Sequence, residues 1–168
     1  MRVLIVSQYF WPESFIINQL ASTLATQGHD LVVLTGKPNY PDGVIYPDYH
    51  QAGVQHQQYD GVEVIRIPMR PRKTGGGKDL LLNSLSFIVS GLLRFPRLVR
   101  GREFDVIFVF APSPITSAIP AIFLKYIKKM HLAVWVQDLW PESLAATGFI
   151  KNKLVLKMVG YLVKAIYA

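Results

Sequence analysis

The sequence predicts an α/β domain with a doubly wound, mostly parallel Rossmann-like sheet and helices on both faces. Two observations predict this fold class. Short continuous apolar runs, typical of strands covered on both faces, alternate with longer stretches of helical apolar spacing. The chain has 168 residues, of which 51% are hydrophobic, and this is enough for one sizeable core. We therefore expect residues 1–168 to form a single domain.

The first elements predict a βαβ unit. Residues 2–7 form a continuous apolar run that predicts a buried strand, and residues 12–27 predict a helix because apolar residues recur on one face. Gly28 is a natural helix end. Residues 31–34 predict the next strand. Two such strands joined by a helix are expected to be parallel, with a right-handed crossover.

A long irregular segment and a hairpin occupy the middle of the chain. Residues 35–55 are rich in Gly, Pro, Asn and Tyr, and loops of this length in compact domains are usually functional or mobile. Asp60-Gly61 is a strong hairpin signal, and it predicts a tight turn before a strand over residues 62–67. Glu63 and Arg66 interrupt the apolar pattern of that strand. We therefore expect the hairpin toward one edge of the sheet.

The second half repeats the alternation of strands and helices. Residues 69–78 hold a glycine triplet and several basic residues, which predicts a flexible segment. Two strands are expected over residues 106–110 and 132–136. Helices are expected over residues 80–99, from Pro114 to about residue 129, and from residue 153 to the end, with a chain break at Gly148. The final helix has no capping glycine or polar tail, so we expect the chain to be part of a longer protein.

The tetrapeptide Trp-Pro-Glu-Ser occurs at residues 11–14 and again at residues 140–143, each time after a predicted strand. Proline suits the first turn of a helix, and glutamate suits the positive end of the helix dipole. Each copy therefore predicts a strand-to-helix turn, where ligands bind in open parallel sheets. A good helix start explains Glu13 and Glu142 fully. It does not explain two of the chain's three tryptophans.

Polar and aromatic side chains gather at the predicted carboxyl ends of three strands. Because these ends meet at one edge of a parallel sheet, we expect the side chains to line one crevice. Amides, hydroxyls and carboxylates match the hydroxyl groups of a sugar, and flat aromatic rings match its apolar face. The candidate acceptor-binding residues are Gln8, Tyr9, Trp11, Glu13, Ser113, Gln137 and Trp140.

Asp138 is the candidate catalytic residue, because it is the one acidic group directly at a strand end. Its carboxylate suits acceptance of a proton from an attacking hydroxyl. The alternative is that Asp138 caps the helix that begins near Pro141. The residues leave both interpretations open.

Several classes of site are not expected. The chain has no cysteine, its four histidines lack metal-ligand spacing, and the dinucleotide pattern G-x-G-x-x-G is absent. We therefore expect no metal and no cofactor. The net charge of +7 favours an anionic partner. We expect no nucleic acid, because no binding motif for it is present.

Two segments suit an anionic membrane surface. Residues 80–95 are strongly apolar and are accompanied by arginines, and the final helix is apolar with interspersed lysines. The basic residues are Arg94, Arg97, Arg100, Arg102, Lys151, Lys153, Lys157 and Lys164. A core helix packed on the sheet explains residues 80–95 equally well. With no signal peptide and no stretch long enough to cross a bilayer, we expect a cytoplasmic protein, peripheral on the inner membrane. A non-enzymatic membrane-surface module is the alternative function.

Four segments, taken together and in order, resemble the family-4 retaining glycosyltransferases. They are residues 8–13, 28–35, 60–68 and 137–143. The last is similar to a stretch in a bacterial subgroup, the O-antigen fucosaminyltransferases, which move N-acetyl-L-fucosamine. Ser14-Phe15 stand where many members have Gly-Gly, and Gln137 stands where many have His.

The resemblance implies a GT-B fold, in which two Rossmann-like domains face each other across a cleft. This chain would be the N-terminal, acceptor-binding domain. The C-terminal domain, which chiefly binds the nucleotide-sugar donor and carries a Glu-x7-Glu motif, would be absent. The implied activity is sugar transfer, with retention, from a nucleotide-sugar to a lipid-linked saccharide acceptor.

Overall fold

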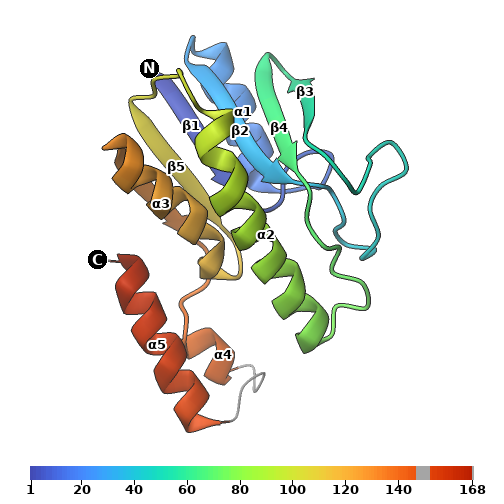
Figure 1. Ribbon diagram of the computed structural model, residues 1–168, viewed down its shortest axis with the longest axis vertical. Coiled ribbons are helices and arrows are strands. Elements are labelled where there is room, and N and C mark those ends of the chain that lie inside the picture. Colours follow the sequence, from blue (N-terminus) through green and yellow to red (C-terminus); the bar gives the residue numbers. More distant parts are fainter. Residues whose placement is uncertain (147–151, 168) are drawn as a thin grey trace.

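The computed structural model describes residues 1–146 and 152–167, which are built around one six-stranded sheet (Figure 1). The strand order is β3-β4-β2-β1-β5-β6, and every neighbouring pair is parallel except β3 and β4. The strands are β1 (Arg2–Ser7), β2 (Asp30–Gly36), β3 (Gln55–Tyr59), β4 (Val62–Ile67), β5 (Val106–Ala111) and β6 (His131–Val136). This confirms the predicted mostly parallel α/β sheet.

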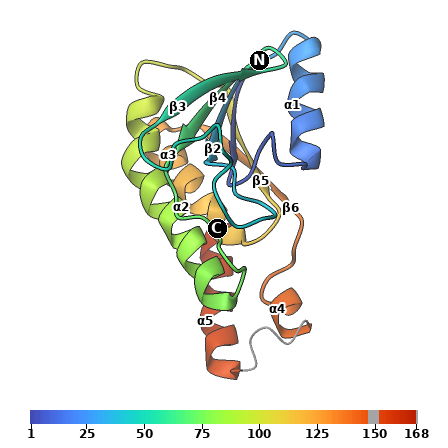
Figure 2. The same cartoon turned by 90° about the vertical axis from the view of Figure 1, so that its right-hand side faces the viewer.

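Helices cover both faces of the sheet (Figure 2). One face carries α1, and the other carries α2 and α3, so the doubly wound arrangement is confirmed. The helices are α1 (Ile16–Thr26), α2 (Gly77–Leu98), the 3-10 helix η1 (Ile115–Ala118), α3 (Ile119–Lys128), α4 (Glu142–Ala146) and α5 (Lys153–Tyr167). The break expected at Gly148 lies outside the described residues.

The two-residue period of each strand divides the core between the faces. In β1, Val3 and Ile5 pack toward α1, whereas Leu4 and Val6 pack toward α2 and α3. All four side chains are buried. A strand buried on both faces needs a continuous apolar run, and this is why the apolar runs in the sequence located the central strands.

The hairpin is confirmed at one edge of the sheet. Asp60 and Gly61 form its turn, with φ angles of 46° and 80°, as a two-residue hairpin turn requires. The edge strand is β3, and β4 lies one place inside it. Glu63 forms an ion pair with Arg102. Arg66, near the carboxyl end of β4, is fully buried.

The prediction that the first helix begins at Pro12 is wrong, because α1 begins at Ile16. The cause is Glu13, whose side chain is only 1% exposed. Its Oε1 accepts hydrogen bonds from the backbone N–H groups of Asn39 and Tyr40, both at 2.8 Å, and its Oε2 accepts one from Phe10 at 3.2 Å. The first Trp-Pro-Glu-Ser copy is therefore a loop that Glu13 ties to residues 37–54.

The second Trp-Pro-Glu-Ser copy agrees better with the prediction. Glu142 is exposed and lies in the first turn of α4, directly after Pro141. Its position suits the positive end of a helix dipole. The same four residues therefore serve two purposes, and only the first copy gains a buried carboxylate.

The apolar helix α2 is partly a core helix. Its inner face buries Phe87, Ile88 and Phe95 against the sheet and α3. Its outer face leaves a row of apolar side chains between 45% and 59% exposed. That row is Leu81, Leu85, Val89 and Leu93. The inner face therefore fits the core-helix interpretation of residues 80–95, and contact of the outer face with a membrane stays a prediction.

Replacing Gly91 with alanine is expected to lower the melting temperature. The added Cβ would lie 2.8 Å from the Cβ and Cγ atoms of Pro120, where α2 meets α3. Overpacking costs about 1–3 kcal/mol, against a gain of about 1 kcal/mol in helix propensity. Gly160→Ala is the control, because the nearest atom to its new Cβ is Pro141 Cγ at 3.7 Å. Thermal denaturation should give Gly160→Ala a higher melting temperature than the parent and Gly91→Ala a lower one. A higher melting temperature for Gly91→Ala would contradict this packing.

Glu13 is expected to make folding stability depend on pH. Burial raises the pKa of its carboxyl to about 7, although its three backbone hydrogen bonds and Arg66 act in the opposite direction. Between the ordinary value of 4.5 and 7, the folded chain holds a proton that the unfolded chain has lost. The free energy of unfolding should therefore fall as pH rises through this window, by roughly 3 kcal/mol at about 1.4 kcal/mol per pKa unit.

Chemical denaturation at about pH 5 and about pH 8 measures this slope. Most of it should disappear in Glu13→Gln and persist in Glu103→Gln, which changes an exposed glutamate. An unchanged slope in Glu13→Gln would show that other groups cause it.

Candidate functional site

The parallel strands bring four loops to one rim of the sheet, at the carboxyl ends of the strands. The order β2-β1-β5-β6 sets these loops side by side. They cover residues 37–54, 8–15, 112–114 and 137–141. The backbone N–H of Gln137 donates to Ala111 O at 3.2 Å, which joins the last two. The three loops that were predicted to meet are therefore neighbours.

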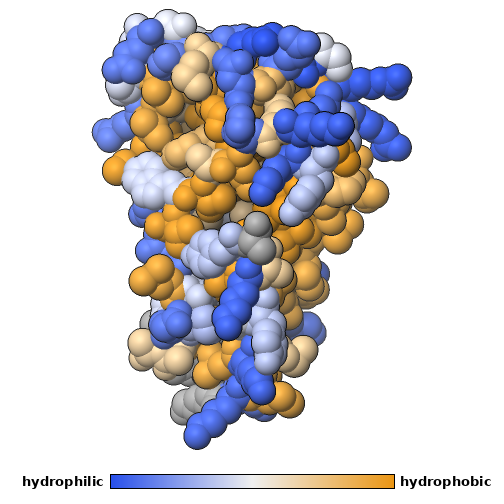
Figure 3. Space-filling view, turned by 90° about the vertical axis from the view of Figure 1, so that its left-hand side faces the viewer, coloured by the Kyte–Doolittle hydropathy of each residue, from blue (hydrophilic) through white to orange (hydrophobic). Residues whose placement is uncertain are grey.

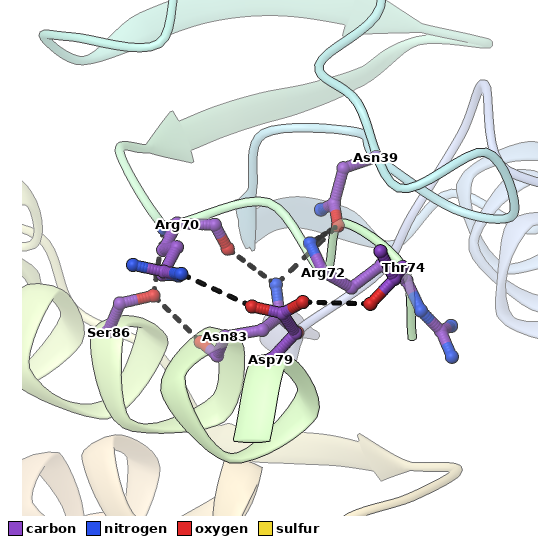
Figure 4. Close-up of polar contacts among 7 residues, drawn as sticks. All are labelled: Asn39, Arg70, Arg72, Thr74, Asp79, Asn83 and Ser86. Carbon is purple, nitrogen blue, oxygen red and sulfur yellow. Dashed lines mark hydrogen bonds and ion pairs between the residues drawn. The ribbon is translucent and has the colours of Figure 1, made fainter. Parts of the chain in front are cut away.

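Asn83 on α2 holds the rim from beneath, and sequence reasoning missed it. Its Oδ1 accepts hydrogen bonds from Gln8 Nε2 at 2.7 Å and from the Tyr9 hydroxyl at 2.9 Å. Its Nδ2 donates to Arg70 O at 2.6 Å and to Asn39 Oδ1 at 3.5 Å (Figure 4). One buried amide thus connects the loops after three strands. An Asn stands within an otherwise largely apolar helical run, but its partners lie in distant segments, so the sequence alone did not assign it this role.

The predicted site residues Gln8, Tyr9 and Glu13 lie beneath the rim surface. Gln8 and Glu13 are each only 1% exposed, and the Tyr9 ring stacks on Phe15 with centroids 5.6 Å apart. Burial raises the pKa of Tyr9 to about 12, so its hydroxyl stays protonated and donates to Asn83. Among the described residues, the buried Gln8 Oε1 has no hydrogen-bond partner. These three side chains shape the rim, and their role in acceptor binding stays a prediction.

The two tryptophans differ in how open they are. Trp11 is 36% exposed and leans on Tyr59, with ring centroids 5.3 Å apart. Its backbone oxygen accepts a hydrogen bond from Arg66. Trp140 is half-buried and packs against the core on the α5 side of the sheet. Trp11 therefore offers the more open flat face to a ligand.

The loops after β5 and β6 present the polar groups that a ligand can reach. Ser113 and Gln137 are exposed. Asp138, which follows Gln137 in the sequence, is half-buried. The helix-cap alternative for Asp138 requires a hydrogen bond from a backbone N–H to its carboxylate. The part of the chain that the structure describes contains no such bond. Its role in catalysis stays a prediction.

Two buried cations lie behind the loops and were not predicted as site residues. Lys37 is fully buried and donates to Gln55 Oε1, and burial together with the neighbouring Arg66 lowers its pKa to about 8. Arg66 donates to Gln57 Oε1 at 2.6 Å and to Gly36 O at 3.2 Å. The charge of Arg66 favours the ionised form of Glu13.

The accessible groups of the rim are polar and aromatic side chains rather than a cluster of metal ligands among the described residues. Within residues 1–146 and 152–167, no group of three or more His, Asp or Glu side chains is placed to hold a metal ion. The accessible groups are a hydroxyl, an amide, a carboxylate and an indole ring. Such groups bind a sugar by hydrogen bonds and by packing against its apolar face.

The fold is similar to that of a solved structure described as the crystal structure of CalG4, the calicheamicin glycosyltransferase. The TM-score is 0.57 at 13% sequence identity, over 99% of this chain and 43% of that chain. At this identity the likeness shows the fold alone, a Rossmann-like domain of the GT-B type. The chain spans less than half of that protein's length. No curated protein matches the sequence.

A family model gives the more specific result. The model of the glycosyl transferase 4-like domain matches residues 15–159, which is most of the chain. The matched range includes α1 to β6, the loop with Asp138 and the second Trp-Pro-Glu-Ser copy. With its mostly parallel sheet and the rim at the carboxyl ends of the strands, the chain belongs to the glycosyl transferase 4-like family.

Proposed function

We propose that this chain is the acceptor-binding half of a retaining glycosyltransferase. In the proposed reaction a sugar moves from a nucleotide-sugar to a lipid-linked saccharide. The observation that carries the proposal is the rim itself: the neighbouring loops after β5 and β6 present exposed Ser113 and Gln137, and Asp138 next to Gln137 makes no helix-cap hydrogen bond in the described chain. That such a rim occurs in a glycosyl transferase 4-like domain supports sugar as the ligand.

The finer identity of the reaction rests on the resemblance of residues 137–143 to the O-antigen fucosaminyltransferases. We propose N-acetyl-L-fucosamine as the sugar and a bacterial surface polysaccharide, such as O-antigen, as the product. Because the chain spans 43% of its structural neighbour, the donor would bind mainly to a second domain. The chain alone is then expected to transfer no sugar.

The proposed role of Asp138 follows from its place at the end of β6. A half-buried carboxylate next to Gln137 can steady the proton that leaves an acceptor hydroxyl, or the positive charge that develops at the sugar. Gln137 and Ser113 would hold the acceptor by hydrogen bonds. The indole of Trp11 would pack against its ring. Gln8, Tyr9 and Glu13 would keep these groups in position.

An anionic membrane surface is the proposed location of the reaction, on the cytoplasmic face of the inner membrane. Apolar side chains are exposed beside basic ones on α3 and α5, and Figure 3 shows apolar and hydrophilic surface interleaved on this face. The exposed apolar residues are Phe123, Tyr126, Ile127, Leu154, Val155, Met158, Tyr161 and Leu162. Among the described helices, none is long and apolar enough to cross a membrane.

Two of the basic residues predicted to meet lipid, Arg102 and Lys151, differ from the others. Arg102 is already bound, because its Nη1 and Nη2 donate to the carboxylate of Glu63 at 2.6 and 3.1 Å. It is therefore not a free lipid contact. Lys151 lies outside the described residues. A non-enzymatic membrane-surface module remains the second candidate function, favoured by the apolar and basic face of α5.

Asp138→Asn, made in the protein that contains both domains, is expected to lower turnover at least about tenfold, or roughly 1.4 kcal/mol of barrier. Asparagine keeps the size of the side chain but not its charge, so folding should be unaffected. Transfer of labelled sugar from a nucleotide-sugar to lipid-linked saccharide measures turnover, and thermal denaturation measures stability.

Asp30→Asn is the matched control, because it removes an exposed aspartate at the opposite end of the sheet. It should leave turnover unchanged. Normal turnover in Asp138→Asn would remove the catalytic assignment. A parent protein that binds vesicles but transfers no sugar from any nucleotide-sugar would favour the non-enzymatic module.

A further inference from the structure

We propose that a hollow between α2 and the segment after β4 binds the phosphate group of an anionic phospholipid headgroup. This inference rests on the membrane location in the proposed function and adds a lipid contact on α2 to the apolar and basic surface of α3 and α5. The hollow has a volume of about 350 Å³. One wall is α2, through Ser86, Val89, Ser90 and Arg94, and the opposite wall includes Met69 and Arg70.

The two arginines give the hollow a net positive charge. Arg94 Nη1 donates to Ser90 Oγ at 3.1 Å, and no carboxylate of the described chain lies within ion-pair distance of it. Arg70 is paired through Nη2 with Asp79 at 3.2 Å (Figure 4). Of the two guanidinium groups, only that of Arg70 has a carboxylate partner in the described chain, and an anion in the hollow would balance the charge of Arg94.

Arg70 also carries a donor that lacks an acceptor. Its Nε is buried and has no hydrogen-bond partner among the described residues. A buried donor left unpaired costs about 1–3 kcal/mol, so an acceptor from a ligand would relieve this cost. The Arg70 backbone is itself held firmly, because its N–H donates to Ser86 Oγ at 2.8 Å and its oxygen accepts from Asn83. The side chain is thus anchored at the edge of the hollow.

Guanidinium groups match the geometry of phosphate oxygens better than a point charge does. Ser90 adds a hydroxyl whose proton is free to donate, since its oxygen accepts from Arg94. A phosphate group between Arg70 and Arg94 would therefore meet donors from two different elements. This set of donors is the reason for assigning phosphate as the ligand chemistry.

The surface next to the hollow indicates that the phosphate belongs to a lipid. The exposed apolar row of α2 (Leu81, Leu85, Val89 and Leu93) lies one residue before the polar row of Ser86, Ser90 and Arg94. Val89 belongs to both the row and the hollow. At 1.5 Å per residue the apolar row runs about 18 Å along the helix, as suits a helix lying in the plane of a membrane interface. An anionic phospholipid would meet the polar row with its phosphate group and the apolar row with its hydrocarbon part.

Vesicle binding by the 168-residue protein tests the site. Arg94→Gln is expected to weaken binding to phosphatidylcholine vesicles containing phosphatidic acid about fivefold, the effect typical of one basic residue near such a surface. Arg2→Gln removes the same charge at the amino end of β1, a position to which no lipid contact is assigned, and it should change binding less than about twofold. Both variants should keep a melting temperature close to that of the parent, because Arg94 has no carboxylate partner in the described chain and the Arg2–Glu103 pair is exposed.

The lipid chemistry is tested by two further arms. Vesicles in which cholesteryl hemisuccinate replaces phosphatidic acid at equal charge should not discriminate Arg94→Gln from Arg2→Gln. Val89→Ser should weaken binding to phosphatidic acid vesicles, whereas Val44→Ser, which changes an equally exposed apolar residue on a loop, should not. Equal losses for the two arginine variants on phosphatidic acid would overturn the phosphate site.

Two other results would be decisive. If inorganic phosphate alone binds the parent as tightly as the vesicles do, the lipid assignment is wrong and the site serves free phosphate. If the parent binds no vesicle of any composition, the proposed membrane location fails together with this site. Vesicle binding that is unaffected by Arg94→Gln would overturn the site and leave the membrane location standing.

Discussion

The rim depends on one buried carboxylate. Glu13 accepts three backbone hydrogen bonds, from Phe10, Asn39 and Tyr40, and so joins the loop after β1 to the loop after β2. A charge in such a place is costly unless it is fully hydrogen-bonded and balanced. Arg66 supplies the balancing charge, and it also donates to the backbone oxygen of Trp11. Arg66 therefore both favours the ionised form of Glu13 and holds the backbone of the exposed tryptophan.

Helix α2 links this rim to the rest of the molecule through its inner face, its outer face and the end that lies near the rim. Its inner face meets the sheet, and Gly91 allows Pro120 of α3 to approach closely. Its end near the rim carries Asn83, which is hydrogen-bonded to the loops after β1, β2 and β4. Its outer face carries the exposed apolar row and the hollow with Arg70 and Arg94. Asn83, together with the contacts of Ser86 and Asp79 to Arg70 and of Ser84 to Thr116, therefore ties α2 to the segments around the rim.

Most of the fold could be predicted from the sequence, because strands buried on both faces and a two-residue hairpin turn leave local patterns. The start of α1 could not. Two identical Trp-Pro-Glu-Ser segments are used differently, since Glu13 finds partners 26 and 27 residues away, whereas Glu142 finds a helix start. The rim was located by the same logic that located the strands. Its buried supports, Lys37, Arg66 and Asn83, depend on contacts between distant segments, so no local pattern revealed their roles.

The central claim is that the rim at the carboxyl ends of the strands binds the acceptor saccharide. Titration with a lipid-linked saccharide, followed by backbone amide chemical shifts, tests it most directly. The account predicts shifts concentrated in the loops after β1, β5 and β6, at Trp11, Ser113, Gln137 and Asp138. Asp30 and Glu63, toward the opposite end of the sheet, should not move. Shifts centred on that opposite end, or no shifts at saturating acceptor, would contradict the assignment of the rim.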